Sequence, residues 1–302
     1  MIALPAAKTD AEAASWNFAE GDEIVPGRTA ITLLGGGNRS EAWLAWDDRL
    51  HTVVVAKLLR PDQLGDPSAI AGLDREARAL SALSHPSIVR CFGAVVDGPR
   101  PHLVLESLDG PRLSTLLRRF GPLAPEQLVA VALEVGSALA FMHDAGYIHL
   151  DIKPRNLIVG ATPMLIDLGI ARTSDEAAGL SSPLGTDAYM APEQCLAATV
   201  ATVGPATDAW GLCVTLYEAM EGRLPFVEVR NASATAARYP QLLDPPAPFT
   251  ARTPEPIAAV LASGLAKDPW ARPSVVELVR AFEDLLPDAR TVARRRLRRR
   301  SR

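Results

Sequence analysis

Apolar runs of strand length, separated by turn residues, dominate the first third of the chain. The runs are rich in β-branched and aromatic residues, and glycine or aspartate stands between several of them. They are ITLL (31–34), EAWLAWD (41–47), TVVVAKLL (52–59), SIVRCFGAVV (87–96) and PHLVLES (101–107). Between the third and fourth runs, residues 70–83 place leucine and alanine on one face at helical spacing. The pattern predicts a small antiparallel sheet with one helix inserted in it.

Helical patterns replace the strand patterns beyond Leu113. The predicted helices cover residues 113–120, 125–146, 207–221, 255–266 and 274–285. Gly146 suits the C-terminal end of the second of these. Short strands are expected beside HLDIKPRNLIV (149–159) and MLIDLG (164–169), and seven prolines between residues 225 and 256 predict an irregular connection.

These patterns predict an α+β fold with two lobes. A small antiparallel β-rich lobe with one helix is expected over residues 29–105 and a larger α-helical lobe over 110–286, joined by residues 106–109. The Ala-rich, weakly patterned residues 1–28 are expected to be a loose lead-in. Residues 287–302 are expected to form an Arg-rich tail.

Composition narrows the class of protein. A chain of 302 residues that is 48% hydrophobic can bury one large core or two modest ones. The most apolar stretch, residues 128–143, carries Glu134 and is expected to be a buried helix rather than a membrane span. No basic segment followed by an apolar one opens the chain, so no signal peptide is expected. Three widely spaced cysteines favour neither a disulfide framework nor a zinc site and indicate a reducing, cytoplasmic location.

Charge is distributed unevenly along the chain. Residues 290–302 hold eight arginines and no acid, which leaves 23 basic and 35 acidic residues elsewhere, a net charge of −12. The tail is either a solvated extension or a segment that holds an anionic membrane surface or an acidic partner. A peripheral position at the inner membrane face would follow from the second option. Nucleic acid is disfavoured, because no aromatic residues are interleaved with the arginines.

An acid, a base and an amide stand close together in the stretch HLDIKPRNLIV. Asp151 can accept the proton of a hydroxyl group, and Lys153 can neutralise charge that develops on a phosphoryl group. Asn156, together with Asp167 of the later IDLG stretch, can hold magnesium. Such a division of labour is what in-line phosphoryl transfer requires.

Two further stretches in the β-rich lobe fit the same chemistry. The G-x-G pattern at Gly35 and Gly37, between two predicted strands, allows backbone N–H groups to approach phosphates, although glycine-rich turns are more often only turns. Lys57 ends an apolar strand, where a lone lysine is more often an edge residue. A phosphate-binding role needs a partner acid, and Glu76 on the following helix can supply one.

Taken together and in this order, these motifs resemble those of the eukaryotic-like protein kinases, especially bacterial Ser/Thr kinases, over residues 29–286. The matching segments are the glycine-rich loop from Gly35 to Ala42, Lys57, Glu76, His149–Asn156, Asp167-Leu168-Gly169, GTDAYMAPE (185–193), DAWGLCVTLYEAMEGRLPF (208–226) and KDPWARPS (267–274). The resemblance implies the bilobal kinase fold, with the helix that carries Glu76 as a regulatory helix. It further implies that Glu193 pairs with Arg272.

The resemblance also implies a set of site residues for ATP and Mg²⁺, with Mn²⁺ as a substitute. Those for the nucleotide are Leu34, Gly35, Gly36, Gly37, Ser40, Ala42, Lys57, Glu76, Glu106, Leu108 and Asp109. Those for catalysis are Asp151, Lys153 and Thr186, with Thr186 bracing the other two, and those for the metal are Asn156 and Asp167. Residues 106–108 would form the hinge and offer backbone hydrogen bonds to adenine, and Leu105 would gate the pocket behind the hinge. Asp109 either reaches the ribose or forms a plain turn.

Three positions depart from the kinase pattern. Ser40 replaces the third loop glycine, and Leu168 replaces the phenylalanine of D-F-G with another apolar residue. Leu150 replaces the arginine that precedes the catalytic aspartate and that, in relatives, grips a phosphorylated loop residue. We therefore expect the loop after Asp167 to be ordered by apolar packing, without a required phosphate. Arg172 is the alternative phosphate ligand.

The function expected from the sequence is a Ser/Thr protein kinase that acts in signalling. A pseudokinase scaffold that only binds ATP is the first alternative, and it is disfavoured because the catalytic positions are intact. A small-molecule phosphotransferase is ranked last, because such enzymes lack Lys153 in that register and the A-P-E segment.

Overall fold

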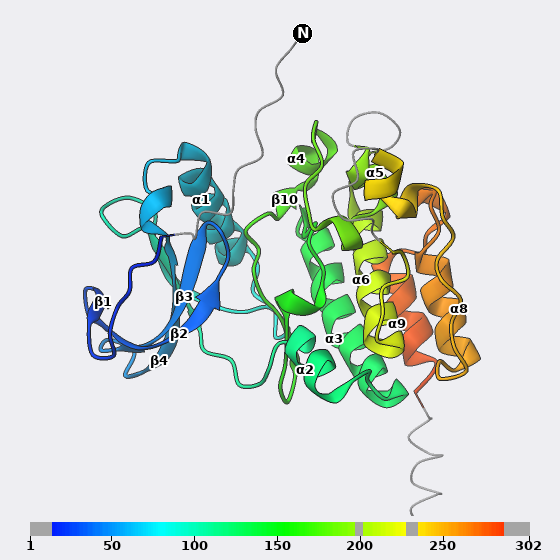
Figure 1. The fold of residues 1–302 in the computed structure, drawn as a ribbon, viewed down its shortest axis with the longest axis horizontal. Helices are drawn as coiled ribbons and strands as arrows, with labels where there is room; N and C mark the ends of the chain where they lie inside the picture. Colours follow the sequence, from blue (N-terminus) through cyan, green and yellow to red (C-terminus); the bar gives the residue numbers. More distant parts are fainter. Residues whose placement is uncertain (1–13, 197–201, 228–234, 287–302) are drawn as a thin grey trace, which may run out of the picture. The chain divides into compact units, whose positions relative to one another are not determined.

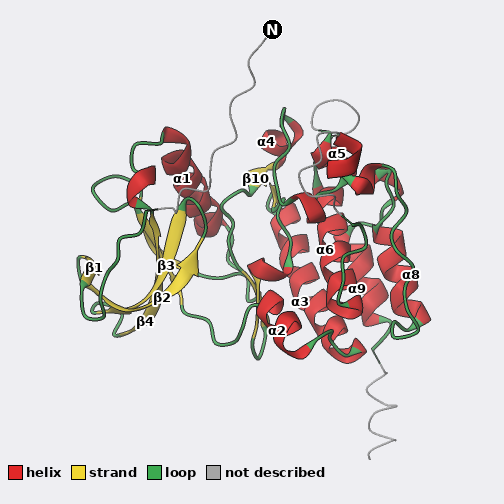
Figure 2. Ribbon diagram, in the orientation of Figure 1, coloured by secondary structure: helices red, strands yellow, loops and turns green. Residues whose placement is uncertain are grey.

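The computed structural model describes residues 14–196, 202–227 and 235–286. It divides into two compact units, each described by itself below: one runs to Ser81 and adds Arg90–Ser107, and the other comprises Ala82–Val89 and the chain from Leu108. Strands concentrate in the first unit and helices in the second, which confirms the predicted α+β class (Figure 2).

The first unit is built on a six-stranded antiparallel sheet in the order β1-β2-β3-β4-β6-β5 (Figure 1). Its strands are β1 Glu23–Val25, β2 Arg28–Gly36, β3 Ser40–Asp47, β4 Thr52–Leu59, β5 Cys91–Val95 and β6 His102–Glu106. A single helix, α1 (Pro67–Ala82), follows β4 after the short turn η1 (Pro61–Gln63). Alternate residues of β3 and β4, such as Trp43, Ala45, Val54 and Ala56, are buried together in its core, as the period of two predicts.

The predicted loose lead-in is wrong for residues 14–28. Trp16 and Phe18 pack against the core of the sheet, and residues 23–25 form β1, which pairs with β2. Burial of large aromatic side chains against the sheet stabilises this segment, although its sequence shows only a weak hydrophobic pattern. Residues 1–13 lie outside the described part of the chain.

The predicted strand over residues 87–96 is wrong for its first four residues. Only Cys91–Val95 forms β5. Residues 87–89 pair elsewhere: Leu165 N–H donates to the Ser87 carbonyl at 2.8 Å, and Val89 N–H to the Leu165 carbonyl at 3.0 Å. An apolar run alone does not show with which segment its backbone will form hydrogen bonds.

The second unit is mainly helical. Its helices are α2 Leu113–Phe120, α3 Pro125–Asp144, α4 Ser174–Ala178, α5 Pro192–Cys195, α6 Pro205–Glu221, α7 Thr235–Arg238, α8 Glu255–Gly264 and α9 Val275–Glu283. The helices predicted at 113–120, 125–146, 207–221, 255–266 and 274–285 are thereby confirmed to within a few residues. Short paired strands complete the unit: β7 Tyr147–Ile148 with β10 Arg172–Thr173, and β8 Leu157–Val159 with β9 Pro163–Leu165.

Helix α3 is the central helix of this unit and packs against α6 and α9. By length and composition it is the one helix in the described residues that could cross a membrane, yet half of its most apolar window is buried inside the protein. Gly136 allows the close approach of α9, since a Cβ there would lie 2.5 Å from Val279 Cγ2. The helix therefore has the packing expected of a core helix.

Candidate active site

Helix α6 holds the polar segment 149–156 in place through hydrogen bonds and close packing. The buried carboxylate of Asp208 accepts the N–H groups of His149 and Leu150, each at 2.8 Å, and lies 2.9 Å from His143 Nε2. One and two turns later, Gly211 packs against Ile152, and Thr215 Oγ1 donates to the Ile152 carbonyl at 3.2 Å. Positions 208, 211 and 215 share one helix face, so a single helix fixes the segment at several points.

The ionisation of this support follows from its partners. Burial alone would raise the pKa of Asp208, but its hydrogen bond with the His143 ring and the N–H group that it accepts from His149 lower that pKa overall. Burial lowers the pKa of His149, against the attraction of Asp208 and the other carboxylates nearby. His149 is therefore a neutral packed side chain, and its Nδ1 accepts the Asp151 N–H at 3.2 Å.

Asp151, Lys153 and Thr186 form a closed triangle of hydrogen bonds. Lys153 Nζ donates to Asp151 Oδ2 and to Thr186 Oγ1, each at 2.6 Å, and Thr186 Oγ1 donates to Asp151 Oδ1 at 2.7 Å. The Lys153 and Asp151 side chains are only 18% and 11% exposed. The carboxylate is thus held by charge-assisted bonds in one orientation, as a group that receives a proton must be.

Asn156 and Asp167 are brought to the same end of the β8–β9 hairpin. Leu157 pairs with Leu165, and the next residue, Ile166, donates its N–H to the Asn156 carbonyl at 2.9 Å. The Asn156 amide nitrogen donates to the Asp151 carbonyl and to Asp151 Oδ2 at 2.9 and 3.1 Å. Asp167 has a left-handed backbone, with φ of 66°.

This pair suits a hard cation. An amide oxygen and a carboxylate are the ligand types that Mg²⁺ prefers. Two protein ligands leave most of an octahedral shell open. Magnesium at this site would complete its shell with water and phosphate oxygens, as it usually does in phosphoryl-transfer sites.

Lys57 and Glu76 form an ion pair in the first unit. Lys57 Nζ donates to both Glu76 carboxylate oxygens, at 2.7 and 2.8 Å. Lys57 lies on β4 between Ala42 of β3 and Leu103 of β6, while Glu76 is a buried residue of α1. The two side chains are 16% and 4% exposed, so the pair fixes the ammonium group at the sheet surface.

The glycine-rich stretch joins β2 to β3. Gly36 pairs with Glu41, and Gly37 N–H donates to the Ser40 carbonyl at 2.9 Å, which closes a tight turn. A Cβ on Gly36 would lie 2.6 Å from the Ser40 carbonyl oxygen, and Gly35 has a φ of 128°. Glycine is therefore required at both positions.

The remaining predicted nucleotide residues lie in the sheet or in the segment that follows it. Glu106 ends β6, and its carboxylate pairs with Arg90 at 2.8 and 3.1 Å. Leu108 and Asp109 begin the longer segment of the second unit, where Asp109 is exposed. Leu34 on β2 is half exposed, and Ala42 on β3 pairs with Lys57.

Comparison with known proteins identifies the family. The Protein kinase domain family matches residues 29–282. The chain belongs to the protein kinase family.

Curated relatives of this kinase include proteins of Mycolicibacterium and Streptomyces species. The chain is 35% identical over 276 residues to the Serine/threonine-protein kinase PknB of Mycolicibacterium smegmatis, which covers 85% of the chain and 43% of that protein. It is 36% identical over 238 residues to PkaA of Streptomyces coelicolor, which covers 76% of the chain and 42% of that protein. The chain thus spans about two-fifths of the length of the curated relatives it matches.

Apolar packing orders the described part of the loop that follows Asp167 in this kinase. Leu150 is 4% exposed and belongs to a buried cluster with Ala177 of α4, against which Leu180 and Leu184 pack. Leu168, which stands in place of phenylalanine, is fully buried. Arg172, the alternative phosphate ligand, donates from Nη1 to the Ile170 and Ala171 carbonyls at 2.9 and 3.0 Å. The loop is therefore packed through apolar side chains around Leu150, as the sequence predicted.

We expect catalysis to be independent of phosphorylation in this loop. The candidate acceptors are Thr173, Ser174, Ser181 and Ser182. Thr173 already caps α4 in a reciprocal pair with Glu176, so a phosphate there would face a carboxylate rather than an arginine. Phosphatase-treated protein and the quadruple alanine variant should keep kcat/KM within about threefold of autophosphorylated protein, because no phosphate-dependent contact is lost. A loss of tenfold or more in both would show that the loop is a phosphate switch.

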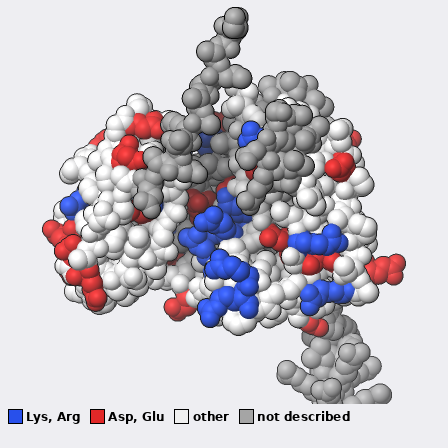
Figure 3. Space-filling model, in the orientation of Figure 1, with Lys and Arg blue, Asp and Glu red and all other residues white. Residues whose placement is uncertain are grey.

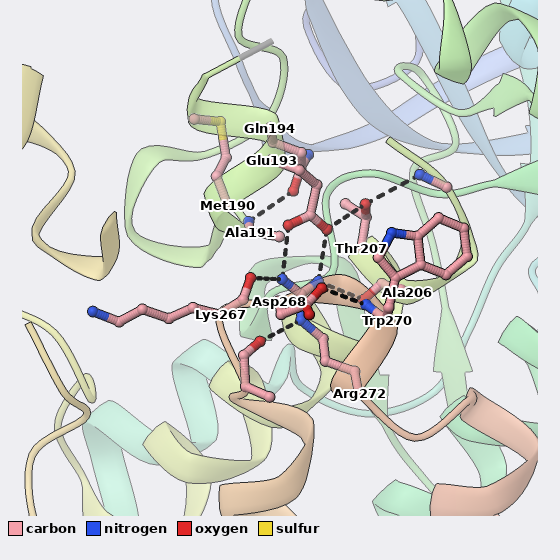
Figure 4. A network of polar contacts seen from close by, with 12 residues as sticks. Met190, Ala191, Glu193, Gln194, Ala206, Thr207, Lys267, Asp268, Trp270 and Arg272 are labelled. Carbon is pink, nitrogen blue, oxygen red and sulfur yellow. Dashed lines mark hydrogen bonds and ion pairs between the residues drawn. The ribbon is translucent and has the colours of Figure 1, made fainter. Parts of the chain in front are cut away.

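The predicted partner of Glu193 is confirmed. Arg272 donates from Nη1 and Nη2 to the two Glu193 oxygens at 2.6 and 2.7 Å, and Thr207 Oγ1 adds a third bond at 2.9 Å (Figure 4). Both charged side chains are almost wholly buried. The pair ties the end of the loop to the segment before α9.

Sequence reasoning missed two supporting residues. Asp208 stood in a motif that was matched but given no role, and Gln194 was not singled out. The Gln194 amide donates to the Leu150 and Leu184 carbonyls at 3.0 and 2.8 Å, so it joins the catalytic segment to the loop. A buried acid at the start of an otherwise apolar helix was the available signal for Asp208. No comparable signal marked Gln194.

Three exposed arginines lie on the catalytic segment and on the helix beside it in the second unit. Arg155 in the turn η2 (Pro154–Asn156) and Arg118 and Arg119 of α2 are exposed, and α2 packs against η2. Figure 3 shows Lys and Arg atoms gathered over and beside α2. Within the described residues these three arginines form no ion pair, so their positive charge is not neutralised.

Proposed function

We propose that this chain is an active Ser/Thr protein kinase that transfers the γ-phosphoryl group of ATP to protein hydroxyls in a signalling role. The hydrogen-bonded set of Asp151, Lys153, Thr186 and Asn156 carries the proposal, because it holds an acid–base group, a cation and a metal ligand in one fixed arrangement. The printed names of the curated relatives, Serine/threonine-protein kinases, support the same substrate class.

Each residue then has a defined task. Asp151 orients the substrate hydroxyl and accepts its proton, while Lys153 stabilises the charge on the transferred phosphoryl group. Lys57, held by Glu76, positions the α- and β-phosphates, and the backbone of residues 106 and 108 binds adenine. Magnesium held by Asn156 and Asp167 would neutralise phosphate charge, a role that Mn²⁺ can also serve.

Transfer of label from γ-labelled ATP to a generic protein substrate in the presence of magnesium tests the proposal. The unmodified chain should label serine and threonine, and Asp151→Asn should abolish the labelling while ATP binding persists. Binding without transfer by the unmodified chain would favour a pseudokinase scaffold. Labelling of an aminoglycoside but not of protein would favour a small-molecule phosphotransferase.

We expect substrates with acidic residues near the acceptor hydroxyl. The unpaired exposed arginines Arg118, Arg119 and Arg155 beside the catalytic segment complement such substrates. Reversing charge with Arg118→Glu/Arg119→Glu should lower kcat/KM about tenfold for an acidic peptide, mainly at low salt, where charges are less screened. Arg252→Glu/Arg280→Glu, which changes the net charge by the same amount at two other exposed sites, is the matched control. An equal loss for acidic and basic peptides would contradict the preference.

The Arg-rich tail lies outside the described residues, and we propose that it binds an anionic membrane surface at the inner face of the cytoplasmic membrane. Eight arginines can each contribute roughly 1 kcal/mol at such a surface. All three cysteines are described and free, which is consistent with a cytoplasmic location. The full chain should sediment with anionic vesicles at low salt and detach as salt rises, whereas a chain ending at Asp288 should not bind. Equal binding by both forms would contradict the proposal.

A further inference from the structure

Residues 14–18 dock onto the sheet of the first unit through specific polar contacts. Trp16 Nε1 donates to the Leu59 carbonyl at 2.8 Å, and the Trp16 ring stacks on Phe18 with 5.9 Å between centroids. The Arg100 guanidinium lies 5.4 Å from the Trp16 ring centre and 5.0 Å from that of Phe18. A segment held only by apolar contact would not need these directional bonds.

The same segment completes the hydrogen bonding of a buried carboxylate. Glu41, on β3 just after the glycine-rich turn, is 1% exposed. Its oxygens accept Ser15 Oγ at 2.8 Å, Trp16 N–H at 3.1 Å and Trp43 Nε1 at 3.0 Å, and Arg60 Nη1 lies at 3.4 Å. Two of these four donors come from residues 15 and 16. Removal of that segment would leave a buried charge with half of these partners.

Arg60 connects this carboxylate to the glycine-rich turn. Its Nε donates to the Gly37 carbonyl at 2.7 Å, its Nη1 to the Ala14 carbonyl at 3.0 Å, and its backbone N–H to the Arg39 carbonyl at 3.0 Å. A Cβ on Gly36 would lie 3.0 Å from Arg60 Nη2, so the guanidinium packs directly against the turn. One side chain therefore contacts the docked segment, Glu41 and the turn.

We propose that residues 14–18, Glu41 and Arg60 form a clamp that positions the glycine-rich turn for ATP. The inference rests on the proposed function, since the turn is assigned to the ATP phosphates there. Three consecutive glycines leave the free turn with many backbone conformations. Fixing the Gly37 carbonyl through Arg60 removes part of that freedom before ATP binds, which strengthens binding by preorganisation. Glu41 and Arg60 are positioning residues, because they act on ATP through the turn.

Trp16→Ala tests the clamp in the full chain. We expect the KM for ATP to rise about tenfold while kcat at saturating ATP stays within about twofold, since preorganisation affects binding rather than the bound state. Amide hydrogen exchange at residues 35–40 of the nucleotide-free protein should accelerate. Ser15→Ala, which removes one donor to Glu41, should give a smaller change of the same kind. Trp46→Ala, a partly exposed tryptophan on β3, is the matched control.

Each outcome decides the inference. Faster exchange at the turn with a raised KM for ATP, both absent in Trp46→Ala, supports it. Unchanged exchange, or faster exchange with an unchanged KM, overturns it. A fall in kcat in parallel with a lower unfolding midpoint would also overturn it, because the segment would then be merely structural. If the unmodified chain transfers no phosphate, the proposed function fails, and exchange together with the Kd of magnesium–ATP decides the clamp instead.

Discussion

Lys57→Met should lower kcat/KM for protein phosphorylation by roughly 100- to 1,000-fold, the effect of removing one preorganised charge-stabilising group from such a site. The ammonium group is held by two hydrogen bonds to Glu76 on a side chain that is only 16% exposed, so its charge is fixed in one position. Methionine keeps the stem packing and removes the charge. Steady-state kinetics with ATP as the varied substrate measures the loss. Activity above about a third of the original would remove Lys57 from the mechanism.

The control for this result must separate catalysis from stability, because the variant leaves the Glu76 carboxylate buried at 4% exposure. Glu76→Gln keeps the side-chain shape and removes that charge. If Glu76 acts only through Lys57, the double variant should be no less active than Lys57→Met alone. It should also unfold at a higher denaturant concentration than Lys57→Met, since no unpaired buried charge remains. Additive losses of activity would show that Glu76 has a separate catalytic effect.

Local patterns predicted the elements that carry the site. The strand with Lys57 followed from an apolar, β-branched run and the helix with Glu76 from helical spacing. Their pairing followed from the need of a phosphate-binding lysine for a partner acid. Asp151, Lys153 and Asn156 lie within six positions, so a single short segment brings them together. Thr186 is 35 residues from Asp151, and only the resemblance to kinases indicated their contact.

Other features depend on contacts that no local pattern reveals. Trp16 and Phe18 stand in a weakly patterned stretch, and their burial is decided by the sheet against which they pack. Residues 87–89 have strand character, but their partner is the segment around Leu165. Gln194 is positioned by two carbonyls that are distant in sequence, Leu150 and Leu184. In each case tertiary packing selects among conformations that the local sequence allows equally.

Arg272 occupies a site in which every donor has an acceptor. In addition to its two hydrogen bonds with Glu193, the guanidinium donates to the Ala206, Ala266 and Lys267 carbonyls at 3.0, 2.6 and 3.0 Å. The five N–H groups of a guanidinium are therefore all used. The guanidinium carbon also lies 5.0 Å from the ring centre of Trp210. Lysine could not reproduce this planar arrangement of donors.

Arg272→Met should lower the free energy of unfolding of the second unit by about 3–5 kcal/mol, the usual cost of leaving one charge of a buried pair unpartnered. Three backbone carbonyls would lose their donor as well, which adds to the loss. Urea unfolding followed by the helical circular dichroism signal measures it, since the helices belong mainly to this unit. Arg238→Met, which breaks the more exposed pair with Asp187 in the same unit, is the matched control and should cost less than about 1 kcal/mol. Equal losses in the two variants would show that the buried Glu193–Arg272 pair contributes no more to the free energy of unfolding than an exposed pair does. If the prediction holds, Arg272→Met/Glu193→Met should be less destabilised than the sum of the single variants, because the double variant leaves no isolated buried charge.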